Sequence, residues 1–303
     1  MASTYTINVS NCGLQPAAWF TAAAFNNSVL SKFSPLAGVK NTITLPKMTV
    51  SGIVKAGDGC SWDPTGAVVV DPRSVSVCDM QVQYELCYSD IENGTYAFEL
   101  RQGALAAPTG TSQVNYMLSL MADGINQTIN NIAFNGDTGL TSSNVLSSCD
   151  GYLNILAATG SGAIAITGAS GGLTTSNIIT EIGKVYLAVP AAVRSKGGIA
   201  IMVSPTAAAL YRIAVANLAN FSPVNAQGLF YLDIPIVEVN YLPTNVMLAG
   251  DPLNFWYAFD APSDETVGAI DQLTMNGTRA VNFFSYFKIG FQIAIPSEVV
   301  YYR

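Results

Sequence analysis

The residues that could carry acid–base chemistry form one loose group of carboxylates: Glu85, Asp90, Glu92 and Glu99. On a helix, Glu92 and Glu99 would share one face, as a general-acid pair would require. The sequence contains no histidine, which removes His-dependent triads and most transition-metal sites. A solvated polar face is therefore the better interpretation. We predict no catalytic residue, no metal site and no cofactor, so we expect that the chain is not an enzyme.

A second candidate for chemistry is the glycine-rich run Gly168-Ala169-Ser170-Gly171-Gly172. A phosphate-binding loop would end in Gly-Lys followed by Ser or Thr, but the first lysine after this run is Lys184. The sequence also lacks a nucleophile elbow and a dinucleotide fingerprint. We interpret the run as a plain loop.

The cysteines do not form a metal-binding pattern. They stand at positions 12, 60, 78, 87 and 149, without a Cys-x-x-Cys pair. No signal peptide follows Met1, and an odd number of cysteines in a chain that is not secreted predicts reduced thiols. We expect these thiols to be buried and inert, with Cys60, in a Gly/Asp-rich loop tip, the most exposed.

The composition points to a surface that other proteins cover. Half of the residues are apolar, but only 11% are charged, against about 25% in a typical soluble domain. A membrane protein would need spans of about 20 predominantly apolar residues. The longest uncharged run, 151–180, is instead rich in Gly, Ser and Thr, so we exclude that class. The net charge of −7 and the scattered basic residues argue against binding of DNA by charge.

The longest amphipathic pattern, Val114 to Phe134, predicts one continuous helix. Its apolar positions, three or four residues apart, are Val114, Met117, Leu118, Met121, Ile125, Ile129 and Ile132. The opposite face is rich in amides, where a free surface helix usually carries Glu and Lys pairs. Its residues are Ser119, Asp123, Asn126, Gln127, Asn130 and Asn131. Such a face suits contact with another protein, although an ordinary core helix remains an alternative.

Two β-prone segments, 48–55 and 67–70, flank turn residues and predict an extended hairpin. Two thin strands bury little by themselves, so a hairpin of this kind normally lies on another surface. An ordinary surface hairpin is the alternative.

The rest of the pattern predicts an α+β chain in which neither half repeats the other. Further helices are expected at 16–33, 89–100, 178–189 and 204–218. Strands are expected at 41–45, 75–84, 199–203, 229–232, 236–239, 254–259, 281–295 and 299–303.

In this order, the segments resemble those of tailed-bacteriophage major capsid proteins of the Hong Kong ninety-seven type. The hairpin Met48 to Val70 resembles the family's extended loop, and Asn115 to Gly139 resembles its spine helix with a terminal Gly-Asp turn. The other matching segments are 76–92, 202–206, 228–237, 248–260 and 291–296. The resemblance covers nearly the whole chain and rests on order more than on identity.

The resemblance implies the phage major capsid fold, with approximate boundaries. Residues 1–45 would form an N-terminal arm and short helix, and 46–74 the extended β-hairpin loop. Residues 75–139 would form the peripheral domain with its spine helix, 140–288 the axial domain, and 289–303 the return to the peripheral domain. Before the arm we find no long charged helical extension, so scaffolding would be a separate protein or be dispensed with. Lys55 lies in the loop, but no motif identifies an Asn partner for the family's covalent cross-link.

The function implied is that of a structural protein that self-assembles into the icosahedral head shell of a tailed phage and encloses its double-stranded DNA. Its partners would be other copies of itself, as hexamers and pentamers, and the portal, scaffolding or decoration proteins of the same phage. It would grip DNA weakly or not at all, bind no membrane, and be located in the virion after assembly in the bacterial host cytoplasm. An encapsulin-like nanocompartment shell of the same fold is the alternative. An enzyme or a carbohydrate-binding β-rich protein is a third possibility.

Overall fold

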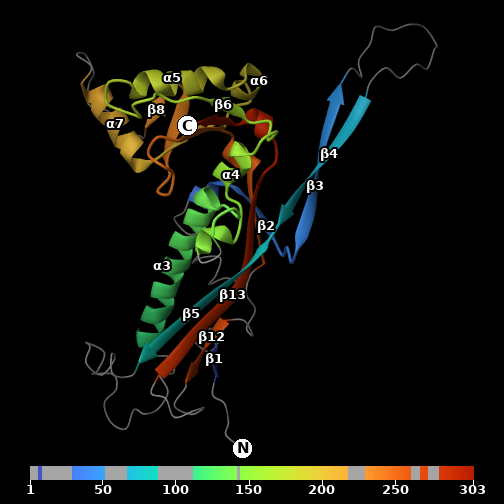
Figure 1. The fold of residues 1–303 in the computed structure, drawn as a ribbon, viewed down its shortest axis with the longest axis vertical. Coiled ribbons are helices and arrows are strands. Elements are labelled where there is room, and N and C mark those ends of the chain that lie inside the picture. The colour runs from blue at the N-terminus through green and yellow to red at the C-terminus, as the bar shows by residue number, and fades with distance from the viewer. Residues whose placement is uncertain are drawn as a thin grey trace, which may run out of the picture.

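The chain builds two sheets and a two-stranded hairpin that extends away from them (Figure 1). The computed structural model describes residues 6–8, 29–51, 67–87, 112–141, 144–217, 229–260, 267–271 and 280–303. The predicted helix at 89–100, the hairpin tip at 52–66 and residues 16–28 of the first predicted helix lie outside the described residues. Of that first helix, the structure describes only the 3-10 turn η2 (Val29–Lys32).

The first sheet has the order β1-β12-β13-β11-β2, and β5 pairs with the free side of β13. Its strands are β1 (Thr6–Asn8), β2 (Ser34–Ala37), β5 (Cys78–Cys87), β11 (Phe255–Asp260), β12 (Val267–Asp271) and β13 (Ala280–Ile293). The centre is β13, where alternate residues from Phe283 to Ile293 are buried. Because successive side chains of a strand point to opposite faces, this pattern of burial confirms the strand that was predicted at 281–295.

The predicted long helix is confirmed as α3 (Ser112–Asn135), which lies beside β5 (Figure 1). Four of its predicted apolar residues, Met121, Ile125, Ile129 and Ile132, are at most 7% exposed and join the core of the first sheet. The chain then passes η4 (Val145–Ser147) and α4 (Tyr152–Ala157). Tyr152 is fully buried among aromatic rings at the centre of this core.

The second sheet has the order β6-β14-β10-β7-β9-β8. Its strands are β6 (Ile164–Ile166), β7 (Ala200–Val203), β8 (Phe230–Tyr231), β9 (Ile234–Glu238), β10 (Met247–Gly250) and β14 (Val300–Tyr302). Its central strands are buried on both faces, which explains their continuous apolar sequences. Met202 and Leu248 face the first core, whereas their neighbours Ile201 and Met247 belong to a second core.

Helices cover the second core. These helices are α5 (Ile178–Ala188), α6 (Ala191–Arg194) and α7 (Pro205–Ala216). Two 3-10 turns lie elsewhere in the chain: η5 (Pro252–Asn254) precedes β11, and η6 (Pro296–Glu298) precedes β14. The predicted start of α7 is confirmed, because the Ser204 hydroxyl accepts a hydrogen bond from the Ala207 amide and Pro205 occupies the first turn.

Strands from both sides of the predicted domain boundaries pair within one sheet. The range 140–288, predicted as the axial domain, includes β11, β12 and most of β13, which all pair in the first sheet with β5. The range 289–303, predicted to return to the peripheral domain, includes β14, which pairs with β10 in the second sheet. The period of a strand reports which of its faces are buried, not which strand lies beside it. The division into five named parts stays a prediction.

Candidate assembly surface

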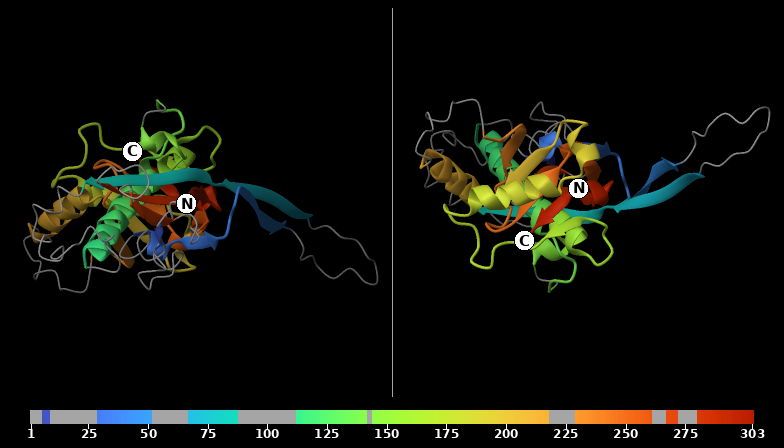
Figure 2. Two further views of the ribbon diagram at one scale, coloured as in Figure 1. Left: turned by 90° about the horizontal axis from the view of Figure 1, so that it is seen from below. Right: turned by 90° about the horizontal axis from the view of Figure 1, so that it is seen from above.

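The hairpin is the most protruding part of the described structure. Strands β3 (Thr42–Ser51) and β4 (Ala67–Ser76) pair only with each other, and they extend to one side of the body in every view (Figures 1 and 2). The register runs from Thr42 opposite Ser76 to Ser51 opposite Ala67. The extended hairpin is therefore confirmed, and its two outer edges offer unpaired backbone groups to another chain.

Both strands of the hairpin continue through a proline. Pro46 lies directly opposite Pro72. Proline has no N–H, so this pair fits a non-hydrogen-bonded position of an antiparallel ladder, where both nitrogens point away from the partner strand. Proline at the edge of a sheet also discourages uncontrolled pairing with other edges.

The root of the hairpin packs on the first sheet through non-covalent contacts. Val75 is fully buried and packs with Val39 and Ala258. The Gln292 side-chain amide donates a hydrogen bond to the Ser74 carbonyl at 2.9 Å. Val75 and Ser74 thus anchor the base of the hairpin to the body, and the ribbon extends away from it (Figure 1).

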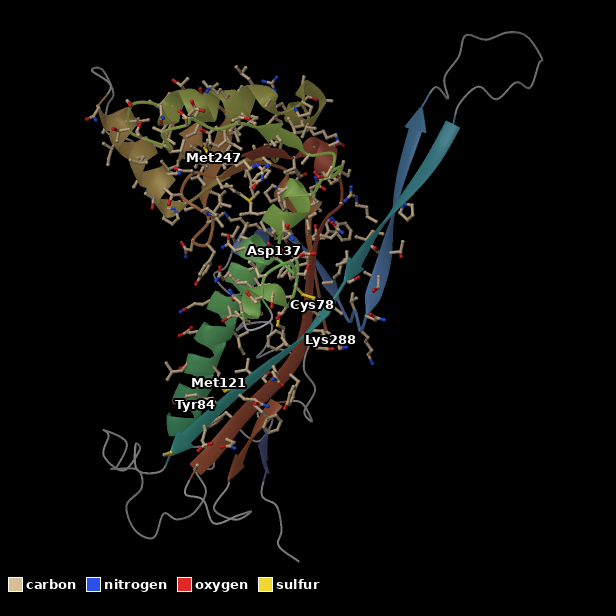
Figure 3. The ribbon with its side chains drawn as sticks, viewed as in Figure 1. Cys78, Tyr84, Met121, Asp137, Met247 and Lys288 are labelled. Atoms are coloured by element: carbon tan, nitrogen blue, oxygen red, sulfur yellow. A yellow bond between two sulfur atoms is a disulfide. The ribbon has the colours of Figure 1, made fainter. Side chains whose placement is uncertain are left out.

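An apolar groove lies between α3 and β5. It has a volume of about 530 Å³, and Figure 3 shows two of its lining residues, Tyr84 on β5 and Met121 on α3, at the same end of the molecule. Leu120, Tyr84 and Val145 line it and are 45–49% exposed. Exposed apolar side chains gathered in a groove are typical of a protein contact surface.

The amide-rich face of α3 is used in part within the chain. The Asn135 amide donates to the Asn131 side chain at 2.9 Å and to the Tyr241 carbonyl at 2.7 Å, which ties α3 to the segment before β10. Asn130 is 7% exposed and donates to Asn126. The exposed residues of this face are Ser119, Asp123 and Gln127, and its contact with another protein stays a prediction.

Another set of exposed apolar residues lies on the second sheet and its helices. Its members are Leu187, Ile213, Phe230 and Leu232, which are 49–74% exposed. Leu232 has a positive φ of 54°, a conformation that non-glycine residues adopt rarely, and it lies in the tight turn between β8 and β9. Strand β8 is the edge of its sheet, so apolar side chains and open backbone groups occur together there.

Several charged side chains of the described residues form ion pairs or hydrogen bonds with other residues of the same chain. Glu181 is 4% exposed and accepts hydrogen bonds from Lys184 at 2.8 Å and from the Tyr302 hydroxyl at 2.9 Å. Burial acts to raise the pKa of the Glu181 carboxyl, but these hydrogen bonds outweigh burial, and the pKa is lowered. Lys288 pairs with Asp79 across the strands at 2.9 Å.

The described residues do not bring the four carboxylates of the sequence analysis together into a site. Glu85 is exposed on β5, and Asp90, Glu92 and Glu99 lie outside the described residues. Among the described residues, no group of three or more His, Cys, Asp or Glu side chains is placed to hold a metal ion. The same residues include no helix with the length and apolar character of a membrane span.

The prediction of reduced cysteines is wrong for two of them. Cys78 and Cys149 form a disulfide, with their Cα atoms 6.0 Å apart (Figure 3). They are 71 residues apart in the sequence, so the spacing gave no signal for this pair. Cys87 is a free and exposed thiol, while Cys12 and Cys60 lie outside the described residues.

Comparison with solved structures identifies the fold. The chain superposes on the capsid of a native GTA particle with a TM-score of 0.62 and 12% identity, covering 91% of this chain and 89% of the other. It superposes on a satellite phage P4 procapsid that includes the size determination (Sid) protein, with a TM-score of 0.65 and 11% identity, covering 100% and 93%. The chain has the phage major capsid fold.

The same likeness extends to a Mycobacterium phage. A Mycobacterium phage Adephagia structure matches with a TM-score of 0.58 and 16% identity, covering 88% of this chain and 83% of that one. No family model and no curated protein matches the sequence. The predicted resemblance and α+β fold class are thus confirmed by shape where the sequences have diverged.

Proposed function

We propose that this chain is the major capsid protein of a tailed phage, which self-assembles into the icosahedral head shell around double-stranded DNA. The observation that carries this proposal is the match of the entire chain, at a TM-score of 0.65, to a procapsid structure. The similar structures named above are phage and GTA capsids, which favours a phage shell over an encapsulin-like nanocompartment. In this role the chain is structural and not an enzyme.

The hairpin supports assembly through contacts between unlike surfaces. The outer edges of β3 and β4 pair with no other strand in the described part of the same chain, whereas a neighbouring copy offers body surfaces such as the groove. A contact between a projection on one copy and a different surface on the next is heterologous, and it closes into rings when the rotation permits. Hexamers and pentamers are such rings.

The charge of the chain suits a container. A net charge of −7 gives no general attraction to DNA, so the genome can move while it is packaged and released. The further partners are the portal, scaffolding and decoration proteins of the same phage. In this proposal the protein assembles in the bacterial host cytoplasm and resides in the virion.

The first test is the association state of the purified chain. Size-exclusion chromatography with light scattering, over a range of protein and salt concentrations, should give pentamers, hexamers or closed shells, and negative-stain microscopy should show them. A compact monomer that persists at every concentration would contradict the proposal.

The second test distinguishes the phage shell from a nanocompartment. Native particles treated with nuclease should retain protected double-stranded DNA. Particles that contain an enzyme and no protected DNA would instead support the encapsulin-like alternative.

A further inference from the structure

We propose that the Cys78–Cys149 disulfide is a redox lock at the root of the hairpin. The pair is a dithiol while the shell assembles in a reducing cell interior, and it is oxidised once the particle reaches an oxidising exterior. The biological role rests on the proposed function, because a shell component makes this passage after assembly.

Cys78 lies at the junction between the hairpin and the body. The last paired residue of the hairpin is Ser76, and Cys78 is the first residue of β5, where it pairs with Ile289. The single residue between the two strands, Val77, donates its amide to the Asn41 carbonyl at 2.9 Å. A covalent bond at Cys78 therefore acts directly on the position of the hairpin root.

Cys149 is fixed to the end of α3. It is 2% exposed and lies between η4 and α4. The next glycine, Gly151, donates its amide to the Gly136 carbonyl at 2.9 Å, and a Cβ on either glycine would lie under 3.0 Å from backbone oxygens. Because the backbone of this loop packs so closely on the helix end, Cys149 moves with α3.

The disulfide thus joins the root of the hairpin to the loop that packs on the end of α3. In the dithiol state, the hairpin root is held by non-covalent contacts, which include the Val75 cluster and the Gln292 hydrogen bond to Ser74. In the disulfide state, the root is also bonded to the loop that moves with α3. The hairpin can adjust to its neighbour while the bond is open and loses that freedom when the bond closes.

The folded chain positions the two sulfurs for reaction, since a Cα separation of 6.0 Å is within the usual range for a disulfide. The oxidant is a low-molecular-weight disulfide. The thiolate of Cys78, which is partly exposed, attacks it, forms a mixed disulfide and releases one small thiolate. The buried Cys149 thiolate then attacks Cys78 and releases the second. Two protein thiols are oxidised, one small disulfide is reduced to two thiols, and the two protons pass to the leaving groups.

The experiment uses two preparations of the full chain. In the first, the cells are quenched in a denaturing buffer that contains an alkylating agent, so that the buried Cys149 is reached, and non-reducing peptide mapping should find Cys78 and Cys149 alkylated. In the second, particles are purified without alkylation under reducing conditions and are then incubated with oxidised glutathione, after which the mapping should find Cys78 and Cys149 joined. A linkage already complete inside the cell, or oxidation that joins other cysteines, would overturn the lock.

Stability provides the second measurement. The melting midpoint of oxidised wild-type particles should exceed that of reduced particles by several degrees, and the exposed Cys87→Ser variant should behave like the wild type. In the double variant Cys78→Ala/Cys149→Ala, oxidation should leave the midpoint unchanged. Equal midpoints for oxidised and reduced wild-type particles would overturn the lock while leaving the capsid function in place. If the chain formed no particles but its melting midpoint still rose on oxidation, the Cys78–Cys149 disulfide would be supported and the proposed capsid function would be contradicted.

Discussion

Gly290 on β13 lies directly against the backbone of Ser76, the last residue of the hairpin. A Cβ at position 290 would lie under 3.0 Å from the Ser76 carbonyl oxygen and would also meet the Cα atom of Val77. The absence of a side chain at Gly290 therefore allows the chain to pass from β4 to β5 close against β13.

The first prediction follows from this contact. Gly290→Ala should lower the free energy of unfolding by about 1–3 kcal/mol, because the added methyl group must displace backbone and not a flexible side chain. Urea unfolding of the unassembled subunit measures the change. Gly124→Ala is the matched control, since nothing lies within 4 Å of its added Cβ on α3, and it should stabilise the helix by about 1 kcal/mol. Equal effects of the two substitutions would contradict the contact.

The second prediction concerns the buried face of α3. Ile125 is 3% exposed, and Ile125→Asp should lower stability by at least about 4 kcal/mol or prevent folding, because the charge has no partner in the core. Circular dichroism and soluble yield measure the outcome. Gln127→Asp, on the exposed face of the same helix, should change stability by no more than about 0.5 kcal/mol. Normal particles from Ile125→Asp would show that the face is assigned incorrectly.

The third prediction distinguishes the role of the outer hairpin in assembly from the role of its buried root in folding. The double variant Ile53→Asp/Val68→Asp should leave the melting of the unassembled subunit unchanged and abolish particles, because each charge would be desolvated at an interface without a partner. Val75→Asp, at the fully buried root, should instead destabilise the subunit itself. Circular dichroism melting and particle counts by microscopy are needed together. Normal particles from the double variant would remove these two residues from the contact network, and a large drop in its melting temperature would place them in the core.

The fourth prediction is a pH dependence caused by Glu181. Hydrogen bonds lower the pKa of this carboxyl in the folded state, so its contribution to stability is present above the unfolded pKa of about 4.3 and is lost as the pH falls through the folded pKa. The stability advantage of the wild type over Glu181→Gln should therefore be larger at neutral pH than in acid.

Urea unfolding of the two unassembled proteins across this pH range measures that difference. Glu298→Gln is the control, because Glu298 forms a more exposed ion pair with Lys196, which should contribute less than about 1 kcal/mol. A difference between wild type and Glu181→Gln that does not vary with pH would refute the assignment.

The sequence by itself determined most of the elements. The spacing of apolar residues predicted α3 almost to its ends, because one buried stripe with a period of 3.6 residues is a local property of the chain. The Ser204-Pro205 start of α7 and the alternation of β13 were likewise readable, since each depends on residues that are neighbours in sequence. The order of these elements was enough to indicate the capsid fold.

Only the tertiary structure decided which distant segments meet. It placed β14 in the second sheet and β11 in the first, although the local pattern of each strand was correctly predicted. It also joined Cys78 to Cys149, and it set Pro46 opposite Pro72. Pairing and disulfide formation depend on the packing of whole sheets and helices, and amino-acid periodicity reports burial without naming the partner.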